Sequence, residues 1–326
     1  MKIGIDCQSI TGAISGLGQY TQKLIELLPQ VDGHNEYHFF RCGKNFRGKT
    51  YDRLLWENFV LPFEAFHQKL DLLHVPAFAA PLFGRVTRRV VVTIHDLIGV
   101  LFPQHLSLPS RFYWSKWLPF VNRHADLIIA DSECTKDDII RYMKVNPQKI
   151  RVVPLAVDER FGLKKNEQEI KSVCLKYSAR RPFIFFLGNV EPRKNLPRLI
   201  RAFKQLKQEQ KIEHQLIIAG SRSWFYPELS EFCKESEDIK FINYVDEDDV
   251  SALYQASDLF VFPSLYEGFG LPILEAMASG VPVVTSNLSS MPEVGGDAVY
   301  YVNPYSEEEI AKAIHDVLGD RSTWNK

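Results

Sequence analysis

The sequence is poor in cysteine, in long apolar runs and in any excess of one charge. Its five cysteines are odd in number and far apart, which excludes a disulfide framework and fits reduced thiols. Lys and Arg number 39 against 40 Asp and Glu, so the net charge of -1 gives no electrostatic footprint for nucleic acid. No apolar run is long enough to span a bilayer, and the N-terminus lacks the layout of a signal peptide. We therefore expect a cytoplasmic protein without a nucleic-acid partner.

Histidine gives no sign of a metal site, because the nine residues are scattered without a pair at ligand spacing. We therefore expect neither a metal ion nor another cofactor. Hydrophobic residues make up 45% of the chain, enough to build substantial cores. A length of 326 residues is typical of about two domains.

Short apolar runs alternate with amphipathic stretches, which predicts α/β architecture with parallel sheets. In the first half the expected strands are Lys2–Cys7, Tyr37–Cys42, Asp71–Val75, Val90–His95, Leu127–Asp131 and Ile150–Val153. The expected helices are Gly18–Leu28, Arg53–Phe66, Ser110–His124 and Glu133–Met143.

The pattern starts again after a polar stretch that runs from Lys164 to Arg181. The expected strands are Phe183–Leu187, Gln215–Ala219, Ile239–Ile242, Asp258–Phe262 and Val281–Thr285, and the expected helices are Leu196–Gln208, Pro227–Glu235, Asp246–Gln255, Pro272–Ser279 and Glu307–Leu318. We place the boundary near residues 157–180, between an N-terminal domain (1–160) and a C-terminal domain (161–326). Both are expected to be Rossmann-like, doubly wound domains. Such sheets bind ligands at the carboxyl ends of their strands, so two facing domains would surround a central cleft.

The most informative segment, Ser257–Thr285, predicts a strand, a glycine-rich loop, a helix and a second strand. Gly268 and Gly270 would let the backbone approach a ligand closely. The amides of Phe269, Gly270 and Leu271 are then expected at a helix N-terminus, which favours negatively charged or polar ligands.

Two carboxylates frame this loop: Glu267 precedes it and Glu275 lies one turn into the helix. A carboxylate can accept two hydroxyl hydrogen bonds, which suits it to hold a ribose or a hexose. A helix cap and a solvated side chain are the alternative for a glutamate pair seen without its surroundings.

The whole segment resembles the donor-binding signature of the retaining glycosyltransferases of family 4, which adopt the GT-B fold. The match covers about thirty consecutive residues. The resemblance implies that Glu267 lies near the donor hexose, that Glu275 holds the ribose hydroxyls and that the loop amides contact the sugar. It also implies transfer of a hexose from a nucleotide diphosphate to an acceptor hydroxyl, with the anomeric configuration kept.

The segment Leu187–Asn195 follows the first strand of the second half and opens a helix. A departing diphosphate gains negative charge, which nearby cations stabilise. Arg193 and Lys194 suit this task, and the resemblance assigns phosphate binding to Lys194. The family commonly has an arginine where this sequence has Asn189, so either Arg193 replaces it or one cation acts alone. The alternative is two solvated charges, although a positive pair opposes the helix dipole there.

Near the N-terminus a glycine-containing turn joins the first strand to the first helix. Its spacing is not the G-x-G-x-x-G of dinucleotide-binding proteins, which argues against a nicotinamide enzyme. In family 4 the similar loop approaches the donor phosphates, so the resemblance marks Gly16 and Gly18 as donor contacts. A tight connection is the alternative.

His95 ends an expected strand, at the sheet edge where ligands bind. Family 4 enzymes often place a histidine from this strand end beside the donor sugar. The resemblance therefore implies that His95 belongs to the catalytic site, where it would bond the hexose or the acceptor. A structural histidine is the alternative.

The stretch Arg111–Phe120 is aromatic and basic, and Arg85, Arg88 and Arg89 add further charge. Together they could contact an anionic membrane surface and a lipid-linked acceptor at the inner face of the cell membrane. We favour the alternative, in which the aromatic residues pack into the core and the basic residues are solvated.

The run Glu191–Asn195 resembles bacterial mannosyltransferases that build surface polysaccharide. The expected donor is GDP-mannose, with a UDP-hexose as alternative, and the expected acceptor is a glycan or lipid-linked hydroxyl in polysaccharide or lipopolysaccharide synthesis. A nucleotide-sugar 2-epimerase and a degenerate nucleotide-binding module stay open. The sequence ends soon after the helix Glu307–Leu318, so the C-terminal helix that crosses back to the first domain in this family is expected to be absent.

Overall fold

The computed structural model describes residues 1–11, 16–43, 50–77, 79–82, 87–209, 211–221 and 236–319. The chain divides into two compact units, Met1–Pro154 and Leu155–Lys326. This division falls a few residues before residue 160, the predicted end of the N-terminal domain.

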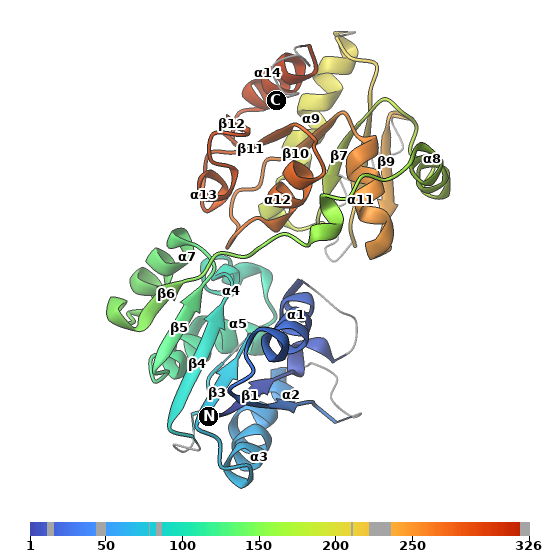
Figure 1. Ribbon diagram of the computed structural model, residues 1–326. Helices are drawn as coiled ribbons and strands as arrows, with labels where there is room; N and C mark the ends of the chain where they lie inside the picture. Colours follow the sequence, from blue (N-terminus) through green and yellow to red (C-terminus); the bar gives the residue numbers. More distant parts are fainter. Residues whose placement is uncertain are drawn as a thin grey trace. The chain divides into compact units, whose positions relative to one another are not determined.

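The first unit contains a six-stranded parallel sheet (Figure 1). Its strands are β1 (Lys2–Asp6), β2 (Glu36–Phe40), β3 (Leu72–Val75), β4 (Arg89–Ile94), β5 (Leu127–Ala130) and β6 (Ile150–Val152). All six were predicted, with bounds that differ by one or two residues. Their order is β2-β1-β3-β4-β5-β6, so the direction of winding reverses between β1 and β3.

The helices of this unit are α1 (Gly16–Val31), α2 (Thr50–Leu55), α3 (Leu61–His67), α4 (Ile98–Leu101), α5 (Leu108–Phe112), α6 (Leu118–Asn122) and α7 (Glu133–Asp138). Three π-helical segments continue α2, α5 and α7: η2 (Trp56–Val60), η4 (Tyr113–Trp117) and η5 (Ile139–Met143). Each of the three longer helices predicted after α1 therefore carries a π-turn, and α4 was not predicted. The short 3-10 helices are η1 (Gln8–Ile10), η3 (Pro103–His105) and η6 (Pro147–Lys149).

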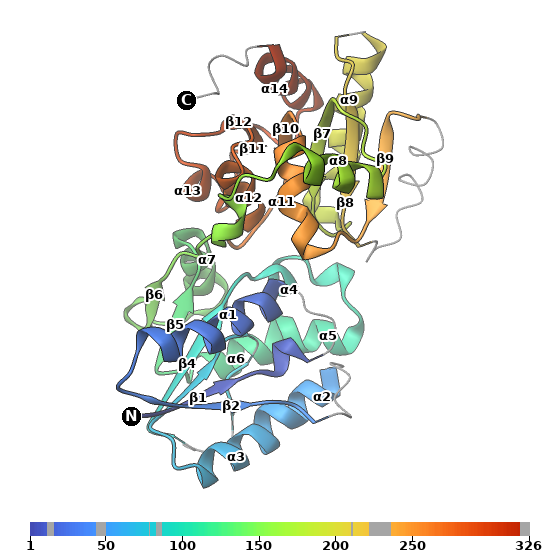
Figure 2. The same cartoon turned by 45° about the vertical axis from the view of Figure 1, so that its right-hand side comes forward.

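The second unit also contains a six-stranded parallel sheet (Figures 1 and 2). Its strands are β7 (Phe183–Leu187), β8 (Gln215–Ala219), β9 (Ile239–Asn243), β10 (Leu259–Phe262), β11 (Val283–Ser286) and β12 (Tyr300–Val302). The order β12-β11-β10-β7-β8-β9 is that of a doubly wound dinucleotide-binding sheet, and it reverses between β7 and β10. The strand β12 was not predicted.

The helices of the second unit are α8 (Glu167–Lys176), α9 (Leu196–Gln208), α11 (Glu247–Ala256), α12 (Leu271–Ala278), α13 (Met291–Gly295) and α14 (Glu307–Gly319), with 3-10 helices η7 (Glu159–Phe161) and η8 (Pro192–Lys194). Contacts join α9 to α14, and they join α11 to both α8 and α12. The predicted helix Pro227–Glu235 lies outside the described residues.

The helix α8 corrects the view of Lys164–Arg181 as a polar boundary. Asn166 caps it by accepting from the Glu169 amide at 2.9 Å, and the Glu169 carboxylate accepts from the Asn166 amide at 3.0 Å. Ile170 and Cys174 bury the inner face. The capping box and the spacing of its apolar residues were visible signals that the high charge of the stretch obscured.

Both cores are formed by the strands together with the inner faces of the helices. In the second unit Phe185, Phe186, Phe260 and Phe262 are fully buried in the centre of the sheet. This explains why these strands are continuous apolar runs rather than alternating patterns. Among the helices in the described part of the chain, none is both long and apolar enough to cross a membrane.

Candidate functional site

The loops that follow β7 and β10 meet at the point where the second sheet changes direction. The two strands are paired neighbours, so their carboxyl ends lie at the same edge. The loop after β7 contains η8, and the Leu265 amide of the loop after β10 donates to the carbonyl oxygen of Arg193 at 2.7 Å. The backbone thus brings the two loops of interest into direct contact.

A buried group of two cations and one carboxylate lies where these loops touch. The Lys194 ammonium donates to one oxygen of Glu267 at 2.7 Å, and the Arg193 guanidinium donates to the other. Arg193 also donates to Glu191 at 2.9 Å. The Lys194 ammonium lies 4.6 Å from the centre of the Phe262 ring, a favourable cation–π contact. Two adjacent cations therefore share a counter-ion that is itself buried.

Burial and charge set the protonation of this group. Burial lowers the pKa of Lys194 below its usual range, although Glu267 opposes that effect. Burial also disfavours the ionised form of Glu267, but the charges of Arg193 and Lys194 outweigh it and hold the pKa of the carboxyl below its usual value. The Glu267 carboxyl is therefore ionised at neutral pH, and an anion that replaced it beside the two basic side chains could take over its role.

Asn195 ties the loops together, and sequence reasoning missed it. Its backbone has a φ of 60°, and its side-chain amide donates to the carbonyl oxygens of Pro263 at 3.1 Å and Pro304 at 2.6 Å. Three loops that follow β7, β10 and β12 thus converge on one buried amide. An Asn directly before a helix was the available signal, since Asn tolerates the left-handed region better than most residues.

The glycine-rich loop leads into α12 as predicted, one residue earlier than expected. Gly270 precedes the helix with a φ of 106°, a conformation that favours glycine. The Ser290 hydroxyl donates to the carbonyl oxygens of Glu267 at 3.0 Å and Phe269 at 2.7 Å, and these contacts hold the backbone of the loop in place. The backbone amides of Gly270 and Leu271, at the N-terminus of α12, have no acceptor within the helix. They mark a site for a negatively charged or polar group.

Close backbone packing also joins the loops that follow β7 and β8. Gly220 directly follows β8 with a φ of 138°, and a Cβ there would lie 2.0 Å from the carbonyl oxygen of Gly188. Asn189, which stands at the position of the family's usual arginine, accepts a hydrogen bond from the Ser221 hydroxyl at 2.7 Å. Arg193 is the second cation beside Glu267 in the structure, and its replacement of the family's arginine stays a prediction.

Glu275 lies on α12 and is partly exposed. Tyr254 donates to its carboxylate at 3.1 Å. Burial raises the pKa of Glu275 to about 7, while Tyr254 and Arg160 favour its ionised form. The carboxyl is thus close to half ionised at neutral pH, and a ligand that donates hydrogen bonds to it would favour the ionised form.

His95 directly follows β4, and both nitrogens of its ring contact protein acceptors. Nδ1 lies 2.6 Å from the carboxylate of Asp131 and Nε2 lies 2.8 Å from the carbonyl oxygen of Pro76. Burial lowers the pKa of His95, but Asp131 and Pro76 outweigh it and raise the pKa above its usual value. Both ring nitrogens face acceptors, so a doubly protonated ring could donate to both. The ring links the ends of β3, β4 and β5, which is the structural alternative; hydrogen bonding from His95 to a sugar stays a prediction.

Gly16 and Gly18 lie inside α1, which begins two residues before its predicted start. Gly16 is exposed and open to solvent, whereas Gly18 is buried. Residues 12–15 of the same turn lie outside the described part of the chain.

The first unit contains a buried cluster of two acidic residues, Asp6 and Glu57, that was not predicted. Asp6 ends β1 and accepts from the Trp56 indole at 2.8 Å and the Gln8 amide at 2.9 Å. The Glu57 carboxylate accepts from the Tyr113 hydroxyl at 2.7 Å and from the Gln8 side chain at 3.3 Å. Burial raises the pKa of Asp6 to about 6 and that of Glu57 to about 8. No sequence motif marks this cluster, because its members come from three distant segments.

The aromatic stretch between Arg111 and Phe120 divides between core and surface. Tyr113 and Leu118 are buried in the core, as favoured, whereas Phe112 and Phe120 are exposed. Arg88 and Arg89 are solvated near the surface carboxylates of Asp71 and Asp126. Arg85 lies outside the described residues.

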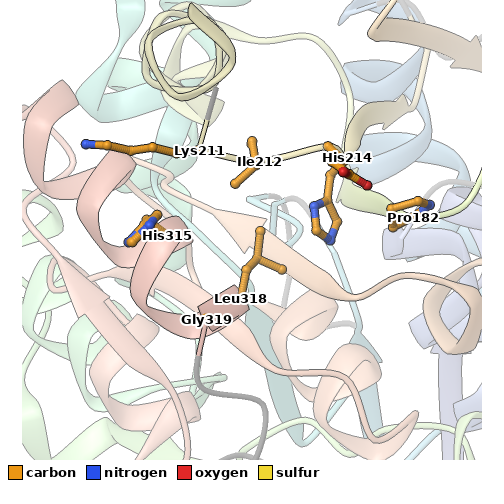
Figure 3. A pocket seen from close by; sticks show the side chains of 8 residues that line it. Pro182, Lys211, Ile212, His214, His315, Leu318 and Gly319 are labelled. Atoms are coloured by element: carbon orange, nitrogen blue, oxygen red, sulfur yellow. The ribbon is translucent and has the colours of Figure 1, made fainter. Parts of the chain in front are cut away.

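A pocket of about 360 Å³ lies at the opposite end of the second sheet (Figure 3). Pro182 and His214 line it, and they precede β7 and β8, so it opens at the amino ends of these strands. Lys211, His315 and Leu318 are among the other residues that line it in Figure 3. The pocket is therefore separate from the loops around Lys194.

Within the described ranges no group of His, Cys, Asp and Glu is arranged to hold a metal ion. An Asp-x-Asp triplet does occur at residues 246–248, at the start of α11. Its first carboxylate accepts from the Lys176 ammonium at 2.6 Å. This contact gives Asp246 a role in fastening α8 to α11.

Comparison with known proteins places these features in a family. Residues 16–161 match the family described as Glycosyltransferase Family 4, and residues 168–326 match Glycosyl transferases group 1. The chain is 34% identical to the O-antigen chain mannosyltransferase B of Escherichia coli, over 100% of the chain and 92% of that protein. It is 32% identical to the serotype-specific mannosyltransferase WbdA of Escherichia coli, over 82% of the chain but only 33% of WbdA.

Solved structures show the same fold. A structure of Anabaena Alr3699/HepE in complex with UDP-glucose matches 100% of the chain and 91% of that protein, with a TM-score of 0.72 and 18% identity. The structure of WaaG, a glycosyltransferase involved in lipopolysaccharide biosynthesis, matches 99% of the chain and 93% of WaaG, with a TM-score of 0.74 and 15% identity.

Proposed function

Because the chain belongs to glycosyltransferase family 4 and has the GT-B fold, we propose that this hexosyltransferase moves a mannosyl group from GDP-mannose to a hydroxyl of a growing surface glycan. The observation that carries the proposal is the buried group of Lys194, Arg193 and Glu267 at the switch point of a dinucleotide-type sheet. The choice of mannose rests on the mannosyltransferase relatives.

The cations supply what a departing nucleoside diphosphate needs. Negative charge grows on the leaving phosphate as the glycosidic bond breaks, and preorganised cations in a buried site stabilise it strongly. In the structure Glu267 already neutralises Lys194 and Arg193. A bound diphosphate would take over part of that role and release Glu267 toward the hexose.

Other groups would orient the donor. Glu275 would accept hydrogen bonds from the ribose hydroxyls, and the amides around Gly270 would contact the sugar at the N-terminus of α12. No side chain at the described site is set up as a nucleophile. We therefore propose that the departing phosphate accepts the acceptor proton, as fits transfer with the anomeric configuration kept.

The acceptor is proposed to be a glycan or lipid-linked hydroxyl, reached by contact with the inner membrane surface. The exposed Phe112 and Phe120 offer apolar area for such contact. Membrane contact would show as sedimentation of the protein with vesicles that contain anionic lipid.

A panel of nucleotide sugars tests the proposal. Stabilisation against heat by GDP and GDP-mannose, but not by UDP or UDP-glucose, is expected, since a ligand at about 100 times its Kd stabilises by about 2.7 kcal/mol. Transfer should then require an added acceptor. A UDP preference would replace the donor, product without acceptor would indicate epimerisation, and no binding of any nucleotide would indicate a degenerate module.

A further inference from the structure

We infer that Tyr254 is a positioning residue for nucleoside recognition: its hydroxyl fixes the Glu275 carboxylate in the orientation that accepts the ribose hydroxyls. The inference rests on the proposed function, in which Glu275 holds the donor ribose. It assigns a role to a core residue outside the glycine-rich segment and its two glutamates.

The contact is local and specific. Tyr254 is fully buried near the end of α11, and its hydroxyl lies 3.1 Å from Oε2 of Glu275 and 3.2 Å from the carbonyl oxygen of Pro272. Both acceptors belong to α12, so one hydroxyl holds the carboxylate against the first turn of its own helix. Donation to a single oxygen leaves the remaining lone pairs of Glu275 for two ribose hydroxyls.

The hydroxyl itself has little freedom. The ring of Tyr254 makes edge contacts with Phe161, Phe185 and Phe260, at centroid distances of 5.9, 5.3 and 5.2 Å. These rings belong to the fully packed core of the second unit. Moving the hydroxyl would require repacking the sheet, so the core sets where the carboxylate can lie.

The charged groups around Glu275 and the hydrogen bond from Tyr254 together set how readily this carboxyl ionises. Asp158 and Glu247 oppose ionisation of Glu275, and Arg160 favours it. Burial is the largest effect and raises the pKa to about 7. Ribose hydroxyls donate best to an ionised carboxylate, and the Tyr254 hydrogen bond favours that form. Loss of the hydroxyl should therefore weaken ribose recognition and move its onset to higher pH.

The test uses Tyr254→Phe, which keeps the ring contacts and removes only the hydroxyl. The probes are GDP, or UDP if wild type prefers it, and the 2′-deoxy form of the same nucleotide. The Kd of the deoxy form divided by the Kd of the ribose form isolates the contribution of the ribose 2′-hydroxyl, because titration of the phosphates affects both values equally. In wild type this ratio should rise through about pH 7; in Tyr254→Phe it should be about tenfold smaller at neutral pH, with its midpoint about one pH unit higher.

Tyr177→Phe is the matched control. Its hydroxyl also donates to a carboxylate on α11, Asp249, at 2.9 Å, but Glu275 is not involved. The variant should keep the wild-type ratio at every pH. In a Glu275→Gln background, adding Tyr254→Phe should cause no further loss, since the tyrosine acts through the glutamate.

The outcomes separate the two proposals. If wild type binds neither nucleotide, the proposed function fails. If wild type binds, but Tyr254→Phe keeps the same ratio and midpoint, or loses equal affinity for the ribose and deoxyribose forms, the positioning role is overturned. The wild-type ratio is informative without any variant: a value that stays flat from pH 5.5 to 8.5 contradicts the ionisation step.

Discussion

Each of the two sheets has a buried carboxylate near the point where its strand order reverses, but the groups around the two carboxylates differ. In the second unit Glu267 follows a strand at the switch point and is ionised, because Lys194 and Arg193 balance its charge. In the first unit Asp6 ends β1 at the switch point and lies beside Glu57. Neutral groups donate hydrogen bonds to these two carboxyls: the side chains of Gln8, Trp56 and Tyr113 and the backbone amide of Gln8.

This difference suggests different ligands. A buried carboxylate with cations beside it can exchange its partners for phosphate oxygens. Buried carboxyls with raised pKa values suit neutral groups, because such carboxyls can both donate and accept hydrogen bonds. The second unit thus places its buried carboxylate beside cations, and the first places Asp6 and Glu57 among neutral hydrogen-bond donors.

Replacing each acid by its amide tests this comparison most strongly. Glu267→Gln removes the counter-ion of the buried Lys194, while Arg193 keeps Glu191, and should lower the free energy of unfolding by about 3–5 kcal/mol. Glu57→Gln should change it by about 1 kcal/mol or less at pH 5, where the wild-type side chain is protonated. Urea denaturation of both variants measures the contrast; equal losses would contradict it.

The pH dependence of the Glu57 variant sharpens the same point. The folded pKa of Glu57 is about 8 and its ordinary value is 4.5, so between these values the folded state holds a proton that the unfolded state releases. This group therefore destabilises the folded state increasingly as pH rises through that window. The amide does not titrate, so Glu57→Gln should become more stable relative to wild type from pH 5 to pH 9. A constant difference would show that Glu57 is ionised throughout.

Lys194→Ala should lower turnover by about 10² to 10³-fold, because the cation stabilises charge that develops on the leaving phosphate. Glu267 keeps Arg193 as a partner, so the fold should persist. Lys176→Ala is the control, since Lys176 is likewise an ion-paired lysine, but it pairs with Asp246 and Asp249 at the surface, at 2.6 Å each. A rate within twofold of wild type for Lys194→Ala, measured with saturating donor and acceptor, would remove Lys194 from the mechanism.

Asn195→Ala should destabilise the second unit by about 2–3 kcal/mol, since it loses two buried hydrogen bonds and strains a positive φ. Asn195→Gly keeps the backbone conformation and loses only the amide. It should fall between wild type and the alanine variant in chemical denaturation. Full stability of the glycine variant would mean that the amide contacts contribute nothing.

Replacing one glycine by alanine in each unit should give the smallest difference in the free energy of unfolding. Gly270→Ala should cost about 1–2 kcal/mol, because its φ is 106° and Ile273 lies 3.3 Å from the position of the new Cβ. Gly16→Ala should instead stabilise by about 0.5–1 kcal/mol, since Gly16 is helical and its Cβ would meet nothing within 4 Å. Thermal unfolding of both variants checks the signs.

The sequence predicts elements well where a single physical signal dominates. The bounds of β7, β8 and α9 match their predictions, since apolar runs and a clear helical period leave no competing reading. The strand β12 is missed because three residues carry too little pattern. The motif places Lys194 and Glu267 at one site, but their hydrogen bond joins residues 73 positions apart and depends on strand order. The double contact of His95 likewise depends on the neighbouring strand ends.

The π-turns η2 and η4 have a consequence for the first unit. Trp56 and Glu57 begin one of them and Tyr113 begins the other, and these side chains meet in the buried acidic cluster. Each residue of a helix advances its direction by about 100°, so shortening either turn by one residue would rotate every later side chain of that helix by that angle. The buried cluster therefore depends on the number of residues in η2 and in η4. Deleting an exposed residue of η2, such as Phe59 or Val60, should be tolerated far less than substituting it.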